Sequence, residues 1–507
     1  MDKKKSLINV CVSLFFKIIL LVLTLLTRRF LIQYVGNEAN GILSLYTSII
    51  GFLAIADLGI GTAITFSMYK PIVEDDKPKI AALYRLFVKF YVIIGLLILV
   101  VGLFLIPFLP YIAKDYGSVD LYSTFIFMLI SVVISYMYSA KTSVINAYKN
   151  NYVTTAIHSS CLIIEAILQI LVLYFYKSFE LFLISKIISV FIEWVVTSIY
   201  FSKHHKELNQ YDSKLDAETK KEVSMKTRAM FMHKIGTILV NTFDSIIISS
   251  FIGVVILGKY NNYTTIVAAM NGIIMLFFTP LTGVIGHLCA KEDVTLQKKY
   301  YNFFYGLNFT LGAIFYLGYY AVIDDFIFLC FGPNLELDQS IIFVITLNYF
   351  IQFMRTSTLT FRDSTGTFYN DRYKPIIEGI LNLILSIVLV KYIGITGVII
   401  ATIITNLLIC HLVEPYVLFV YAFESKPNKF YFMNYFCVSL FVVFLFLLNY
   451  THLNISNNWL SLFLNGIIAV FLSIIPITLM FIINKDFREE FFSIIKVLVC
   501  KLKHKVI

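Results

Sequence analysis

Charged side chains inside long apolar runs are the residues of this sequence best placed to do chemistry. The first run carries Lys17, Thr24 and Arg28, and steps of seven and four residues put all three on one face of a helix. Lys17 would lie about 15 Å from one helix end, close to the middle of a bilayer core of about 30 Å. A charge at that depth costs at least about 2.5–3.5 kcal/mol, so it should face a protein interior or a water-filled cavity.

A second set of polar side chains shares one face of the apolar run between residues 339 and 362. Asn348, Gln352 and Arg355 follow one another at steps of four and three residues, and Arg362 comes seven residues later. This spacing places all four on one stripe of a helix. Arg355 lies too deep in the run for exposure to lipid. We therefore expect this helix to present its cations to the interior of the protein.

Acidic side chains interrupt three further runs, at Asp57, Glu165 and Asp244. A buried carboxylate in a membrane either pairs with a cation on a neighbouring helix or belongs to an ion pathway, and both roles stay open for these three. The adjacent Arg28 and Arg29 also have two interpretations. They either line a cavity or extend to the lipid headgroups.

Two neighbouring runs repeat this pattern of polar stripes. His158, Glu165 and Gln169 share one face of the run over residues 154–176, and Lys186 and Glu193 lie seven residues apart in the next run. Pairing between charges on these neighbouring helices is the simplest interpretation.

The elements that position these groups are predicted to be membrane-spanning helices. Of the 507 residues, 59% are hydrophobic and only 14% are charged, whereas soluble domains are about one quarter charged. Apolar runs of about 20 residues, the length that spans a bilayer, recur along the chain. The runs are continuous rather than alternating, so they predict helices and not a barrel. The sequence predicts an all-α polytopic membrane protein.

We predict about 14 transmembrane helices. With this arrangement, 33 of the 41 lysines and arginines fall on the side of the N-terminus, six on the other side and two within the spans. Because cytoplasmic loops are enriched in basic residues, this asymmetry predicts that both termini are cytoplasmic. It also explains the net charge of +10 without nucleic-acid binding. The predicted spans are residues 7–32, 42–66, 84–108, 120–143, 154–176, 180–201, 233–256, 260–288, 303–332, 339–362, 375–392, 397–422, 432–450 and 458–483.

The chain is predicted to contain two similar halves. YVGNEANGILSLYTSI, which begins at Tyr34, aligns with FIGVVILGKYNNYTTI, which begins at Phe251, at a constant offset of 217 residues. The matched pairs include Gly36 with Gly253, Gly41 with Gly258, and Tyr46 with Tyr263. Internal repeats of this kind characterise transporters, which bind their substrates between the repeats.

The predicted organisation is therefore two pseudo-symmetric six-helix lobes plus two C-terminal helices. The N-terminal lobe covers residues 1–201 and a polar cytoplasmic linker covers residues 202–232. The second lobe covers residues 233–422, and residues 423–507 form the two additional helices and a basic cytoplasmic tail. The seven cysteines are scattered and form no CxxC or Cys/His spacing, so we predict no metal site, disulfide or cofactor.

Four stretches resemble one family of membrane proteins. They are FLIQYVGNEANGILSLYTSIIGFLAIADLGIGTAI from Phe30, YKPIVEDDKPKIAALYRLF from Tyr69, INAYKNNYVTTAIHS from Ile145, and FRDSTGTFYNDRYKPIIEGILNLILSIVLVKYIGITGVIIATIIT from Phe361. They resemble the Wzx-type polysaccharide repeat-unit flippases, which belong to the multidrug/oligosaccharidyl-lipid/polysaccharide exporter superfamily. The resemblance covers most of residues 1–425, whereas the last two helices match only in being apolar.

The resemblance implies a function without catalysis. Proteins of this family move undecaprenyl-diphosphate-linked oligosaccharide repeat units, the building blocks of capsule and O-antigen, across the bacterial plasma membrane by alternating access. The implied substrate-binding residues are the cations, with arginine suited to bidentate phosphate contacts, and one amide. They are Lys17, Arg28, Arg29, Arg355, Arg362 and Gln352. The implied coupling or charge-pairing residues are Asp57, Glu165 and Asp244, which would serve a coupling proton or sodium ion.

Two other functions stay open at this point. A multidrug or cation antiporter of the same superfamily would favour an acidic or apolar cavity, whereas deep cations are present here. A polysaccharide polymerase commonly needs a large outer loop, and the predicted outer loops are short. The implied partners are the lipid-linked oligosaccharide, membrane lipids, and a polysaccharide polymerase with its chain-length regulator.

Overall fold

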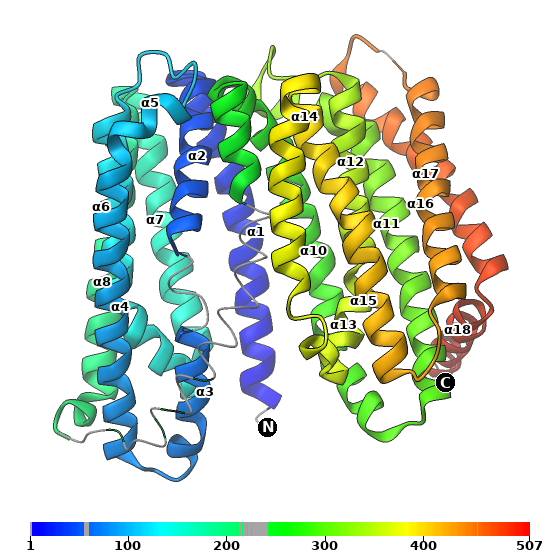
Figure 1. Cartoon of the computed structure of the whole chain (residues 1–507), viewed down its shortest axis with the longest axis horizontal. Helices are drawn as coiled ribbons and strands as arrows, with labels where there is room; N and C mark the ends of the chain where they lie inside the picture. Colours follow the sequence, from blue (N-terminus) through cyan, green and yellow to red (C-terminus); the bar gives the residue numbers. More distant parts are fainter. Residues whose placement is uncertain are drawn as a thin grey trace. The chain divides into compact units, whose positions relative to one another are not determined.

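The structure is a computed structural model of the chain, and it describes residues 3–54, 60–211, 242–453 and 455–506, with isolated positions at 215, 219, 221 and 225. Asp57 and most of the predicted linker at 202–232 lie outside the described residues. The described residues are nearly all helical and contain no strand, which confirms the predicted fold class (Figure 1). The chain divides into two compact units, Met1–Lys259 and Tyr260–Ile507.

Unit 1 consists of long helices that pack as neighbours. α7 packs against α1 and α8, α8 packs against α6, and α6 packs against α4. A further helix runs over Thr242–Phe251, and α10 begins in this unit. The helices are α1 (Lys3–Tyr34), α2 (Asn37–Leu53), α3 (Ile60–Val73), α4 (Lys77–Leu105), α5 (Leu109–Ile112), α6 (Leu121–Ala147), α7 (Asn151–Tyr176), α8 (Phe179–His204) and α10 (Val254–Lys291).

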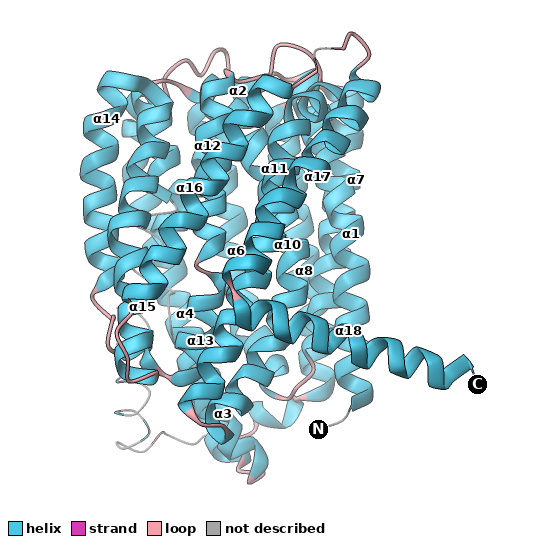
Figure 2. Cartoon of the chain, turned by 90° about the vertical axis from the view of Figure 1, so that its right-hand side faces the viewer, coloured by secondary structure: helices cyan, strands magenta, loops and turns pink. Residues whose placement is uncertain are grey.

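Unit 2 is built around α11, which packs against α12, α16, α17 and α18. Figure 2 shows α18 running crosswise to the long helices and extending beyond them toward the C-terminus. The helices that follow α10 are α11 (Val294–Phe331), α12 (Gln339–Met354), α13 (Thr356–Thr365), α14 (Lys374–Thr405), α15 (His411–Val417), α16 (Asn428–Thr451), α17 (Asn458–Ile483) and α18 (Lys485–Val506). Two π-helical segments, η5 (Asn406–Cys410) and η6 (Leu418–Ala422), flank α15.

Several helices begin where a polar side chain caps them. Asp76 accepts a hydrogen bond from the backbone N–H of Lys79 at the start of α4, and Asp293 accepts one from Leu296 at the start of α11. Such caps satisfy amides that have no partner inside the helix. Asp120 caps α6 in the same way, and the resulting hydrogen bonds, first that from the Ser123 hydroxyl, lower the pKa of its carboxyl below the usual range.

Seven helical segments within the described residues are long and apolar enough to cross a membrane, and these extend over 24 to 49 residues. Their surfaces carry large exposed apolar side chains, such as Trp459 at 70% and Phe471 at 66% exposure on α17. Apolar surface of this extent is stable against lipid and costly in water. The chain is a multi-pass membrane protein, while the predicted number of 14 spans stays a prediction.

One predicted boundary appears as a kink. The spans predicted at 375–392 and 397–422 are continuous in the hydrogen-bonding pattern of α14 and the segments after it, but Ile393 and Gly394 depart from helical geometry. Gly394 has φ +59° and ψ −141°, a combination that is open almost only to glycine. The glycine at position 394 therefore sets the break in the helix.

The predicted repeat has matching local structure in its two copies. Gly36 lies directly before α2 with φ +125°, and Gly253 lies directly before α10 with φ +132°. Tyr46 is fully buried, and its hydroxyl donates to the Leu121 carbonyl at the start of α6 (2.9 Å). These equivalences hold at the offset of 217 residues.

The second tyrosine of the repeat repeats this role in unit 2. Tyr263 is fully buried, and its hydroxyl accepts from the Leu337 N–H just before α12 (3.1 Å) and donates to Asp324 (2.6 Å). Both tyrosines thus fix the start of the helix that is fourth in its half. The sequence repeat therefore corresponds to a repeat in local structure and is not a chance match of apolar residues.

The two copies of the repeat also meet inside unit 1, where the start of α2 crosses the start of α10. Asn37 donates to the Val255 carbonyl (2.7 Å), and Asn40 donates to the Gly258 carbonyl (3.0 Å). A side chain at Gly41 would overlap the backbone at Val254, and one at Gly258 would lie within 2.7 Å of the Asn37 carbonyl. The two helices therefore pack backbone against backbone at equivalent glycines.

Candidate functional site

A cavity of about 220 Å³ lies in unit 1 between α1, α2, α7 and α8. We call it the basic cavity, because two cationic residues and one acidic residue are among those that line it. Its polar lining residues are Thr24, Thr27, Arg28, Asn40, Glu165, Gln169 and Lys186. Thr24 and Arg28 come from the stripe predicted on α1, and Glu165 and Gln169 come from the stripe predicted on α7.

The helices of unit 1 hold these polar groups in place. Gln169 is buried and donates to the Glu165 carboxylate one turn earlier on α7 (3.1 Å). Asn40, which is 1% exposed, is fixed by its bond to the Gly258 carbonyl. With Arg28 and Lys186 cationic and Glu165 anionic, the cavity has one excess positive charge. A low-dielectric cavity of this charge is suited to an anionic group.

The other cations predicted on α1 lie outside this cavity. Lys17 and Arg29 are exposed on the surface of α1 and do not line the basic cavity. The structure thus separates Arg28 from its neighbour Arg29, although the sequence left both interpretations open for the pair. Asp244, on the helix Thr242–Phe251, is half-buried and also lies away from the cavity lining.

Unit 2 contains a second buried group of charges, the charge cluster Arg355, Lys374, Glu378 and Glu414. Arg355 donates to Glu414 through two bonds, from Nε at 3.0 Å and Nη2 at 2.6 Å. Lys374 contacts Glu414 at 2.5 Å and Glu378 at 3.1 Å. The side chains are between 1% and 16% exposed. Two cations meet two carboxylates, so the cluster is neutral as a whole.

The remaining predicted residues of unit 2 are also engaged by neighbours. Arg362 is 6% exposed and donates to Asp371 at 2.6 Å. Gln352 donates to Asn348 at 3.1 Å, four residues earlier on the predicted stripe. Arg355, which the sequence placed on that stripe, connects the end of α12 to the start of α13 and points to Asn406 and Glu414.

Some members of these groups were missed at the sequence level. The sequence alone assigned no role to Glu414, Glu378 or Lys374. The partners of Glu414 lie 59 and 40 residues away in the chain, a separation that helical periodicity cannot connect. Lys186 was identified as an intramembrane charge, and its place beside Glu165 in the basic cavity fits the predicted pairing between α7 and α8.

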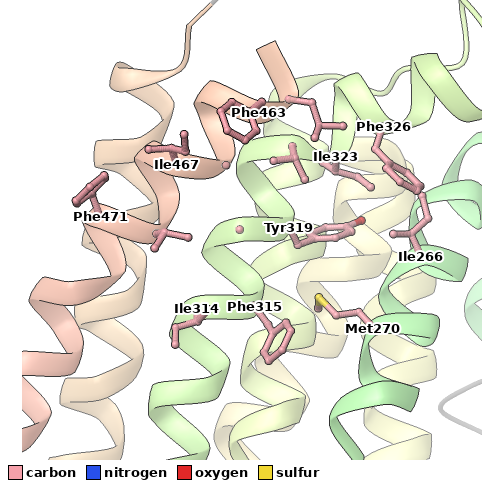
Figure 3. A pocket seen from close by; sticks show the side chains of 15 residues that line it. Ile266, Met270, Ile314, Phe315, Tyr319, Ile323, Phe326, Phe463, Ile467 and Phe471 are labelled. Atoms are coloured by element: carbon pink, nitrogen blue, oxygen red, sulfur yellow. The ribbon is translucent and has the colours of Figure 1, made fainter. Parts of the chain in front are cut away.

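An apolar groove of about 680 Å³ lies in unit 2 between α10, α11 and α17. Figure 3 shows apolar and aromatic side chains from the three helices facing it. They include Ile266, Met270, Phe315, Tyr319, Phe463 and Phe471. None of the lining residues that the structure describes is charged. Such a groove suits a hydrocarbon chain.

Solved structures with a similar fold are membrane transporters. The chain superposes on the lipid II flippase MurJ in an inward closed conformation with a TM-score of 0.63 at 15% identity, covering 93% of this chain and 98% of MurJ. It superposes on an inward-facing MATE family multidrug resistance transporter of the MOP superfamily with a TM-score of 0.60 at 13% identity, covering 85% and 98%. The chain therefore has the fold that these two proteins share.

The family follows from the sequence match. Residues 6–282, more than half of the chain, match the family described as polysaccharide biosynthesis protein. The chain belongs to this polysaccharide biosynthesis protein family. The two solved structures of similar fold are themselves a flippase and a transporter. No curated protein sequence matches the chain.

Proposed function

We propose that this protein is a flippase that moves undecaprenyl-diphosphate-linked oligosaccharide repeat units across the bacterial plasma membrane by alternating access, for the synthesis of a cell-surface polysaccharide. The basic cavity carries this proposal. Arg28 on α1 and Lys186 on α8, two helices that the sequence predicts to span the membrane, both line this cavity. A diphosphate supplies charge-assisted acceptors for both.

The apolar groove supports the lipid part of the proposal. Its three helices offer a long surface without charged groups, to which a polyprenyl chain can bind without leaving an apolar environment. A small multidrug substrate would not need such a groove. The excess positive charge of the basic cavity would also repel an organic cation, which is the substrate of the alternative antiporter function.

The energy source and surroundings complete the proposal. A proton or sodium ion would drive transport through Asp57, Glu165 or Asp244. In the sequence, the apolar run with Asp57 follows the run that carries Arg28, and the run with Glu165 precedes the run that carries Lys186. The termini would be cytoplasmic, as the distribution of basic residues predicts. A polysaccharide polymerase and its chain-length regulator would receive the flipped substrate.

Binding to purified protein in nanodiscs tests the proposal. Undecaprenyl diphosphate should bind the wild-type chain, and Arg28→Ala and Lys186→Ala should each weaken binding by about tenfold or more, because each removes a charge-assisted contact. Lys203→Ala on the exposed end of α8 is the matched control and should bind normally. No binding by the wild-type chain, or equal binding by all variants, would refute the proposal.

A further inference from the structure

A second polar cavity of about 410 Å³ lies in unit 1, between α4, α6, α7 and α8. We call it the hydroxyl cavity, because seven of its nine lining residues are Ser, Thr or Tyr. The other two are His158 and Glu193. His158 Nδ1 lies 3.0 and 3.1 Å from the two carboxylate oxygens of Glu193, and Glu193 is 8% exposed.

Three hydroxyls of the hydroxyl cavity have their protons engaged and present their oxygens as acceptors. Ser139 and Ser143 donate their protons to backbone carbonyls one turn earlier on α6 (2.8 and 2.9 Å), and Thr154 donates to the Asn151 carbonyl (2.9 Å). Their oxygen lone pairs remain available. The Glu193 carboxylate also retains acceptor positions beside His158. A ligand that fits this wall must be rich in hydroxyl donors.

The contact between His158 and Glu193 argues against a cationic ligand. Glu193 already has His158 as a partner, so a cation would have to compete with it for the carboxylate. A neutral polyol can instead share the remaining acceptor positions without displacing His158. Sugar rings carry several hydroxyl donors at fixed spacing, which suits a wall of acceptors on three helices.

The hydroxyl cavity and the basic cavity lie on the same faces of the same two helices. On α7, His158 precedes Glu165 by seven residues, and on α8, Lys186 precedes Glu193 by seven. Seven residues are two helical turns, about 10.5 Å along the axis. The step on α7 leads from the hydroxyl cavity to the basic cavity, and the step on α8 leads back. Because α7 and α8 pack against each other and are joined by only two residues, they run antiparallel, so both helices place the basic cavity on the same side of the hydroxyl cavity.

We propose that the hydroxyl cavity binds a sugar next to the diphosphate of the lipid-linked substrate, while the basic cavity binds the diphosphate itself. This rests on the proposed function. The two-turn spacing then positions the carrier phosphates and the first sugars of the repeat unit together. His158 acts as a positioning residue that holds the Glu193 carboxylate toward the sugar hydroxyls.

A comparison of two kinds of lipid tests the inference. Wild-type protein in nanodiscs is titrated with bare undecaprenyl diphosphate and with undecaprenyl diphosphate carrying glucose, galactose or N-acetylglucosamine. At least one glycosylated lipid should bind more tightly than the bare lipid. Glu193→Gln and Thr142→Val should weaken binding of that lipid by about tenfold and leave bare-lipid binding unchanged, because only sugar contacts are lost.

The control and the outcomes separate this inference from the proposed function. Glu74→Gln, an exposed acid outside both cavities, should change neither affinity, and the thermal unfolding temperature of each variant checks its folding. If bare lipid binds but no sugar improves binding, or if the cavity variants weaken both lipids equally, the sugar site is refuted and the diphosphate site stands. If neither lipid binds the wild-type chain, the proposed function fails first.

Discussion

Arg355 and Glu414 form a two-bond pair inside unit 2, although 59 residues separate them in the chain. Lys374 reaches the same carboxylate from the first turn of α14. Glu414 is thus bound by two cations and is 1% exposed. The pair ties the junction of α12 and α13 to α15, a short helix flanked by π-helical turns.

Breaking this pair should destabilise the protein. Arg355→Met leaves two carboxylates around Lys374, and Glu414→Leu leaves two cations around Glu378. Loss of one partner from a buried ion pair typically costs about 3–5 kcal/mol. The double variant Arg355→Met with Glu414→Leu keeps the Lys374–Glu378 pair and restores neutrality, so it should be more stable than either single variant. Thermal unfolding in detergent measures this, and additive losses would contradict it.

The same series shows whether Arg355 also binds substrate, as the sequence implied. If its role is structural, export of surface polysaccharide should recover in the double variant together with stability. If export stays abolished in a double variant that unfolds at the wild-type temperature, Arg355 has a direct role in transport.

Removing the carboxylate from the basic cavity should strengthen anion binding. Glu165→Gln keeps an acceptor for the Gln169 amide but removes the negative charge of Glu165 from the cavity that Arg28 and Lys186 line. We expect undecaprenyl diphosphate to bind about tenfold more tightly, a change of roughly 1.4 kcal/mol, and export to slow because release is hindered. Glu74→Gln serves as the control. Weaker binding by Glu165→Gln would show that this carboxylate helps to hold the substrate.

The cap of α6 gives a prediction with a defined pH dependence. Asp120 accepts hydrogen bonds from the Tyr122 and Ser123 amides (3.0 and 3.4 Å), and the lowered pKa of its carboxyl reflects these bonds and the one from the Ser123 hydroxyl. Because the folded-state pKa is depressed, the stabilisation is present above the unfolded pKa of about 3.9 and is lost as the pH falls through the folded value.

Asp120→Ala should therefore lower the unfolding temperature at neutral pH, by an amount equivalent to about 0.5–2 kcal/mol. Asp120→Asn should lose much less, since asparagine is an equally good cap. The difference between wild type and the alanine variant should shrink as the pH is lowered below about 4. A difference that is independent of pH would contradict this origin.

The kink in α14 predicts a cost for adding one methyl group. Gly394 has no neighbouring atom within 4 Å of an added Cβ, so Gly394→Ala meets no clash and its whole cost is conformational. We expect a loss of about 1–3 kcal/mol in thermal unfolding. Gly286→Ala in α10 also has open space but helical geometry, and it should be neutral or slightly stabilising. Equal stability of both variants would contradict the assigned strain.

Local spacing explains what could be predicted from the sequence. The helices follow from continuous apolar runs, and the shared faces of α7 and α8 from steps of seven residues. Arg28, Glu165 and Gln169 were therefore found before their cavity was known. The sequence alignment of Tyr46 with Tyr263 could also be made, because both copies of the repeat keep a tyrosine for the same hydrogen-bonding role.

Contacts between distant helices explain what could not be predicted. Nothing local distinguishes Arg28, which lines a cavity, from Arg29, which is exposed. The charge cluster joins residues from three separate segments, and the contacts of Arg355 depend on the packing of α14 and α15 beside it. Asp57 lies outside the described residues, so its predicted role stays a prediction.

The crossing of α2 and α10 has a consequence for the origin of the chain. At this crossing Asn37 and Gly41 of one copy of the repeat contact Val254, Val255 and Gly258 of the other, and Gly258 in turn contacts Asn37. Such a reciprocal contact is the kind that a two-fold symmetric dimer makes. Because Asn37 is equivalent to Val254 and Gly41 to Gly258 in the repeat, these positions contact one another as the two sides of such an interface do.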